Sequence, residues 1–248
     1  MTIKKMRALL VLLVGSVMLY AQDEQEDDYL LLLPKNEVNK ENIVDLQYQA
    51  LTGNSDSLLK VLDYFRFWNY NREKVEFWEL IDAEDGERFS AYNYSNHCYS
   101  GSRVSSRAAF WLLKDRQERD SNSMDPYVSP EMKAFLESLD PESLSANVDS
   151  ISDVDVLKDY AFKGNRDAAY KLSKLCGDED RHQSLLKIGA VFAKSEYWEN
   201  SRCFWLRIGA QNGSKECIRE YIELLKNSTD TFDNARAVFW ESQLDSKN

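Results

Sequence analysis

Apolar residues recur along much of the chain at intervals of three and four, which is the spacing of one face of an α-helix. Three segments show the pattern: Leu58, Leu62 and Phe65; Ala168, Leu172 and Leu175; and Ile218, Ile222 and Leu225. The whole chain holds only nine Gly and four Pro, which also favours helices over turn-dense β-structure. The pattern therefore predicts an all-α fold.

A four-residue motif, Ala-x-x-Gly, occurs at 50–53, 83–86, 161–164 and 210–213. Gly adopts positive φ angles without strain, so it is suited to closing a helix at its C-terminus. In three copies an Asn or Ser follows the Gly, and an acidic residue comes two positions later. This order is typical of an N-cap and the first turn of a new helix. The motif predicts a helix–short turn–helix joint.

Phe-Trp pairs form a second repeated feature. They end at Trp68, Trp78, Trp111, Trp205 and Trp240, and all but the first follow a basic residue and a small or β-branched one. Because they recur with the repeat, we expect these pairs to fill the core between helices. The alternative is an aromatic ladder that binds a ligand.

At these residues the chain resembles the Sel1-like repeat family, relatives of the tetratricopeptide repeats. Members carry a basic-Ala-x-x-Trp helix that leads to Ala-x-x-Gly-Asn and a second helix, and residues 201–213 give the clearest match. The resemblance implies an irregular α/α solenoid of Sel1-like, TPR-like helical hairpins, with about four to five units. Its structural residues would be Ala50, Gly53, Trp78, Ala83, Gly86, Trp111, Ala161, Gly164, Trp205, Ala210, Gly213 and Trp240.

The repeats are expected in two parts of the chain, 39–116 and 152–243. The stretch between them, 117–151, holds three of the four Pro and no Phe-Trp pair, which predicts an irregular connector. Residues 22–38 are predicted to form an acidic N-terminal tail.

Residues 1–21 have the pattern of a secretory signal peptide. Lys4, Lys5 and Arg7 precede an apolar run of thirteen residues, 8–20, which is too short to span a bilayer core of about 30 Å. Cleavage is expected after Ala21, with an uncleaved anchor as the alternative. The mature protein is then periplasmic or secreted, with no membrane insertion.

Composition excludes two further classes. The chain is 43% hydrophobic and 12% aromatic, which is too apolar for a disordered protein. Its formal net charge is −11, and loss of the three basic side chains of 1–21 makes it −14. No nucleic-acid partner is therefore expected.

The sequence offers little reactive chemistry. It lacks phosphate-binding, zinc-protease, hydrolase and calcium-loop motifs, so we expect no enzyme and no cofactor. His97 and His182 have no second ligand pair at a metal-site spacing, so no metal site is expected. In an oxidising compartment Cys98, Cys176, Cys203 and Cys217 could form disulfides of unknown pairing, or remain small buried residues.

Aromatic residues outside the repeat pattern are the candidates for partner binding: Tyr92, Tyr94 and Trp198, together with Tyr64, Tyr70 and Tyr99. The charge of the mature chain favours a protein partner with a basic contact patch. The Sel1-like resemblance implies an adaptor or scaffold, or a periplasmic immunity protein that neutralises a secreted toxin. The alternative is a Sel1-type protein that binds or hydrolyses cell-wall fragments or β-lactams, although that family carries a Cys pair in each repeat and this chain does not.

Overall fold

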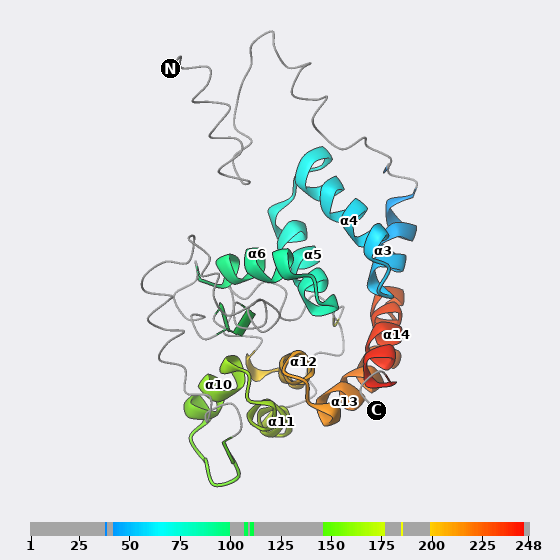
Figure 1. Cartoon of the computed structure of the whole chain (residues 1–248). Coiled ribbons are helices and arrows are strands. Elements are labelled where there is room, and N and C mark those ends of the chain that lie inside the picture. Colours follow the sequence, from blue (N-terminus) through cyan, green and yellow to red (C-terminus); the bar gives the residue numbers. More distant parts are fainter. Residues whose placement is uncertain are drawn as a thin grey trace, which may run out of the picture. The chain divides into compact units, whose positions relative to one another are not determined.

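The computed structural model of the chain (Figure 1) describes residues 38, 42–99, 107–108, 110–111, 146–176, 185 and 199–245. All of them belong to one compact unit, Asn36–Asn248. Every regular element in this part of the chain is helical, so the predicted all-α class is confirmed there. The predicted signal peptide, nearly all of the acidic tail and most of the connector lie outside the described residues.

The elements follow one another in short helices. They are α3 (Ile43–Leu51), α4 (Ser55–Asp63), the π-helix η1 (Tyr64–Trp68), α5 (Arg72–Asp85), α6 (Arg88–Tyr99), α10 (Val154–Lys163), α11 (Arg166–Leu175), α12 (Arg202–Gln211), α13 (Lys215–Lys226) and α14 (Thr231–Asp245). Consecutive elements pack together: α3 on α4, α5 on α6, and each of α10 to α14 on the next.

The four joint glycines are the described glycines with positive φ: 97° at Gly53, 105° at Gly86, 114° at Gly164 and 87° at Gly213. After three of them a side-chain oxygen caps the next helix. Asn54 accepts a hydrogen bond from the Ser57 N–H, Asn165 from the Ala168 N–H, and Ser214 from the Cys217 N–H. The joints thus bring the chain into a new helix within two residues, as the Gly and N-cap chemistry dictates.

Gly164→Val is expected to lower the free energy of unfolding by about 1–3 kcal/mol, because a β-branched residue is strained at positive φ. Gly164 has a φ of 114° as the residue that closes α10. Urea denaturation measures the effect. Glu223→Val, on the exposed side of α13, is the matched control and introduces the same side chain at an ordinary helical position. Equal stability losses in the two variants would contradict this role for Gly164.

Helices far apart in the sequence share one core. α14 packs on α3 (Figure 1). The ring of Phe239 lies against Gly53 at the joint between α3 and α4. A single cluster of buried apolar side chains includes residues of α3, α4, α5 and of α10 to α14. The last described helix of the chain, α14, therefore packs against the first described helix, α3. The two segments predicted as repeats are in direct contact.

The predicted repeat residues lie inside this packing. Ala50, Ala83, Ala161 and Ala210 are all buried, as are the ring systems of Trp78, Trp111, Trp205 and Trp240. The predicted apolar stripes of α4 and α13 are buried too. Leu175 is an exception: it is the last residue of α11 and is exposed, so the stripe of that helix ends at Leu172.

Candidate functional site

Two of the tyrosines proposed as surface anchors are in the core. Tyr94 is 1% exposed, and its ring meets that of Trp111 edge-on with centroids 5.9 Å apart. Tyr64 is buried as well. The expectation that these two side chains lie exposed for a partner is wrong, because both are buried in the folded chain. Tyr92 is half-buried.

Tyr70, in contrast, is 70% exposed, and Phe67 and Trp68 beside it are 37% and 38% exposed. We call residues 67–70 the aromatic segment. Trp198 and the side chain of Tyr99 lie outside the described residues. Three large rings within four exposed residues are the most concentrated aromatic surface in the described part of the chain.

The backbone explains why the aromatic segment faces solvent. The Asn69 N–H donates to the Tyr64 carbonyl over 2.8 Å, a five-residue separation that makes the turn a π-helix. The wider turn changes which side chains face inward: Phe65 stays buried while Phe67 and Trp68 emerge. The sequence carried a signal of this difference, because this Phe-Trp pair lacks the basic and small residues before it.

The residues on either side of the aromatic segment form ion pairs and a helix cap. Arg66 Nη2 lies 2.7 Å from Glu79 Oε1, and Arg72 Nε lies 2.7 Å from Glu76 Oε1. Asn71 caps α5 by accepting a hydrogen bond from the Lys74 N–H at 3.0 Å. The Arg66–Glu79 pair thus connects the π-helix to α5 on one side of the segment, and the Asn71 cap starts α5 on the other side. The Arg72–Glu76 pair lies within α5, and both arginines are paired with carboxylates of that helix.

The basic residues of the Phe-Trp signature have more than one role. Arg107 lies 3.8 Å from the ring centroid of Phe110, and Arg236 lies at the same distance from that of Phe239. Each guanidinium therefore stacks on the Phe three residues later, an attractive cation–π geometry. Arg202 instead forms an ion pair with Glu220 at 2.7 Å.

Glu84 is the centre of a buried polar network that the sequence did not reveal. Its Oε1 accepts from Arg207 Nε at 2.7 Å and from Gln211, and its Oε2 accepts from Arg236 Nη2 at 2.9 Å. Arg236 Nη1 also lies 2.7 Å from Asp85 Oδ1. The end of α5 is thereby joined to α12 and α14.

Burial and the arginines act on these carboxyl groups in opposite directions. Burial alone would raise the pKa of Glu84, but Arg207 and Arg236 outweigh it and lower the pKa to about 2. At Asp85 burial dominates over Arg236, and the pKa rises to about 6. Glu84 is therefore a permanent anion, and its role is to balance two buried cations.

The network continues to the joint between α10 and α11. Arg107 donates to Gln211 Oε1 and, at 2.8 Å, to Asn212 Oδ1. Asn212 in turn donates to the Ala161 carbonyl at 2.8 Å. Since Arg107, Arg207, Arg236 and the side chain of Glu84 are almost fully buried, the network is placed to fix helix packing and offers no access to a substrate.

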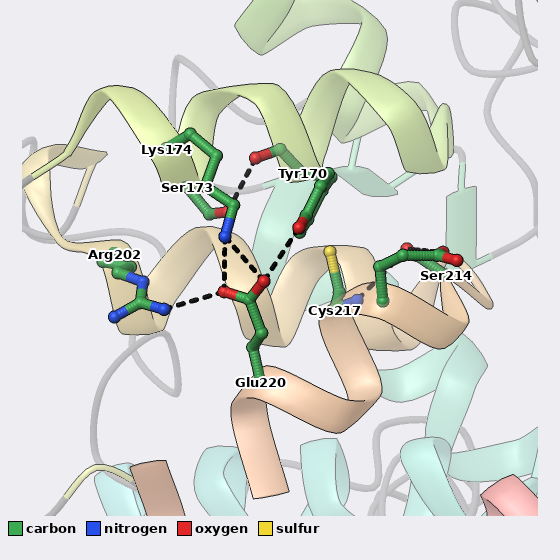
Figure 2. Close-up of polar contacts among 8 residues, drawn as sticks. Tyr170, Ser173, Lys174, Arg202, Ser214, Cys217 and Glu220 are labelled. Atoms are coloured by element: carbon green, nitrogen blue, oxygen red, sulfur yellow. Dashed lines mark hydrogen bonds and ion pairs between the residues drawn. The ribbon is translucent and has the colours of Figure 1, made fainter. Parts of the chain in front are cut away.

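A second carboxylate joins α11, α12 and α13 nearer the surface. Figure 2 shows Glu220 accepting from Lys174 Nζ at 2.6 and 2.8 Å, from Arg202 at 2.7 Å and from the Tyr170 hydroxyl at 2.8 Å. Partial burial raises its pKa, but these donors outweigh that effect and lower the pKa to about 2. Every partner is a side chain of α11 or α12, so the cluster stabilises the packing of α13 on these two helices.

Three of the four cysteine side chains lie in the described part of the chain, and the surroundings of Cys217 make it an unreactive buried thiol. Cys176, Cys203 and Cys217 are thiols in the structure, and burial raises the pKa of Cys217 to about 12, which leaves it protonated. The side chain of Cys98 lies outside the described residues, so the possibility of disulfides with unknown pairing stays a prediction. Among the described residues no group of three His, Cys, Asp or Glu side chains could hold a metal ion, and no helix is long and apolar enough to cross a membrane.

Comparisons of the chain with protein-family models, with curated proteins and with solved structures give no match.

Proposed function

We propose that this chain is an exported, non-enzymatic repeat protein that binds another protein, either as an adaptor or scaffold or as a periplasmic immunity protein. Its helices would form an irregular solenoid of Sel1-like hairpins. The observation that carries the proposal is the exposure of Phe67, Trp68 and Tyr70 on a fold whose other Phe-Trp pairs supply buried tryptophans.

The aromatic segment has the properties of an interface anchor. Trp and Tyr residues dominate the binding energy of many protein interfaces, because they bury a large area at a small entropic cost. Here the Arg66–Glu79 pair joins the π-helix to α5, and the Asn71 cap fixes where α5 begins after the rings. The segment then loses less conformational entropy when a partner binds.

The charge of the chain favours a partner with a basic contact patch. The mature sequence carries −14, whereas the arginines beside the aromatic segment are paired with carboxylates. Long-range attraction would then raise the association rate, and ring burial would set the dissociation rate. Surface charge is screened over about 8 Å at physiological salt, so added salt should slow association and leave dissociation nearly unchanged.

Affinity capture of the mature protein from native extract, followed by binding kinetics with the captured partner, tests the proposal. We expect the double variant Trp68→Ala/Tyr70→Ala to lose about 2 kcal/mol or more of binding free energy, because both exposed rings are removed. Tyr48→Ala is the control, since Tyr48 is 45% exposed on α3 and outside the segment.

Three outcomes would contradict the proposal. One is a partner whose affinity is the same for the wild type and the double variant. Another is a partner with an acidic contact surface and salt-independent association, which would contradict the electrostatic part. The third is turnover of muropeptides or nitrocefin by the mature protein, which would favour the cell-wall or β-lactam alternative.

A further inference from the structure

Helix α5 carries an unusual row of buried acidic residues. Glu76, Glu79, Asp82 and Asp85 follow one another at intervals of three, which places them along adjacent turns of one helix. Glu84 stands beside this row. The first three and Glu84 are buried, although buried carboxylates are rare unless they are paired.

Four of the five carboxylates have a cation within hydrogen-bond distance. The pairs are Glu76 with Arg72, Glu79 with Arg66, Glu84 with Arg207 and Arg236, and Asp85 with Arg236. Asp82 differs: among the described residues its hydrogen-bond partner is the Ser90 hydroxyl of α6, which donates to Asp82 Oδ2 over 2.5 Å. A hydroxyl cannot neutralise a buried charge, so the protonated form of Asp82 fits its surroundings better.

We propose that Asp82 is a proton-binding residue that makes the packing of α6 on α5 depend on pH, so that α6 is held more firmly in mildly acidic than in neutral solution. This inference is independent of the proposed partner. It assigns a role to a buried acidic group that the proposed partner binding does not use.

The groups that face Asp82 support this direction. Burial raises its pKa from the ordinary 3.8 to about 6, and repulsion from Glu87 and Glu79 adds to the rise. The Ser90 hydrogen bond and the positive charge of Arg66 act in the opposite direction and do not outweigh burial. Between these two pKa values the unfolded chain is ionised and the folded protein holds the proton, so stability falls as the pH rises through this range.

The effect of Asp82 on the pH dependence of stability must be distinguished from that of other titrating groups. Asp85, whose pKa is also about 6, acts in the same direction but contacts α14 through Arg236. The lowered pKa values of Glu84 and Glu220, both about 2, make stability fall only as the pH drops below about 4.5, their ordinary value. The chain has two histidines, His97 and His182. A background with both replaced by Gln ensures that no histidine contributes to the pH dependence.

The test uses the full mature chain in that background. Carbon-detected NMR titration of side-chain carboxyl groups should give Asp82 a midpoint near pH 6, the value of its raised pKa. Hydrogen exchange of α6 amides, corrected for the intrinsic pH dependence of exchange, should show protection that falls by up to about tenfold per pH unit between pH 4 and 6.

Two variants decide the origin of that fall. Asp82→Asn, a neutral isostere, should keep α6 protected at neutral pH and remove its pH dependence. Asp149→Asn, at an exposed residue in the turn before α10, should behave as the parent does. A carboxyl midpoint near 4 for Asp82, or an α6 pH dependence that Asp82→Asn leaves intact, would overturn the proposal.

Discussion

Glu84→Gln is expected to lower the free energy of unfolding by about 3–5 kcal/mol, because it leaves two buried guanidinium groups without their shared anion. Glu84 lies within 2.7 Å of Arg207 and 2.9 Å of Arg236, and both arginine side chains are almost fully buried. The amide of the variant keeps the size of the side chain, so the loss reports charge and hydrogen bonding. Urea or thermal denaturation of the mature protein measures it.

Glu216→Gln is the matched control. Glu216 lies 3.9 Å from Arg219 on the surface of α13, with both side chains more than half exposed. Exposed pairs of this kind contribute about 0–1 kcal/mol. If Glu84→Gln cost no more than Glu216→Gln, the network would not fix the packing of α5 on α12 and α14.

A triple replacement tests whether the loss of stability in Glu84→Gln comes from unpaired buried charge. When Glu84, Arg207 and Arg236 are all replaced by Met, the variant should be more stable than Glu84→Gln alone, because no unpaired buried charge remains. Removal of only Arg207 or only Arg236 should be costly, since each leaves part of the network unsatisfied.

Trp205→Ala carries the second large effect. Trp205 is fully buried, its ring contacts those of Phe204 and Phe162, and its Nε1 donates to the Glu199 carbonyl at 2.8 Å. Truncation of a buried Trp leaves a cavity and costs about 3–5 kcal/mol. We expect a loss of this size in the free energy of unfolding.

Trp68→Ala provides the comparison, because Trp68 is also the second residue of a Phe-Trp pair but is exposed. Its effect on stability should stay within about 0.5 kcal/mol, as for other surface substitutions. A severe loss of stability in Trp68→Ala would show that the aromatic segment is part of the core. Equal tolerance of both substitutions would contradict the packing role of Trp205.

Local chemistry is the reason that the joints could be predicted from the sequence. A Gly at positive φ and a capping Asn or Ser satisfy backbone groups within a few residues, so Gly164 and Asn165 indicate their turn without knowledge of distant contacts. The apolar spacing of α4 and α13 was equally informative, because a helix fixes which side chains share a face.

The polar contacts between distant helices could not be predicted in this way. The pairs Glu84–Arg207 and Glu84–Arg236 link positions 123 and 152 residues apart, and nothing in the local pattern of α5 distinguishes these acids from solvated ones. The packing of α14 on α3 is similarly non-local. This contact joins the two predicted sets of repeats in space, although they are separated in the sequence.

Tyrosine exposure failed as a prediction for a related reason. Tyr94 and Tyr70 are both aromatic residues outside the repeat signature, yet one is buried and the other is 70% exposed. The difference comes from the segment 107–111, whose Trp111 ring covers Tyr94, and from the π-turn that exposes the residues after Phe65. The contact between Tyr94 and Trp111 has no local sequence signal. The missing basic and small residues before Phe67 mark this Phe-Trp pair as different from the others, but they do not predict a π-turn.

Hydrogen–deuterium exchange of the mature protein with and without its captured partner tests the central claim most directly. The account predicts new protection across 64–74, which includes the aromatic segment, with little change in the buried amides of α12 and α13. Protection confined to other helices, with 64–74 exchanging as fast as in the isolated protein, would contradict the claim that this protein binds its partner through Phe67, Trp68 and Tyr70.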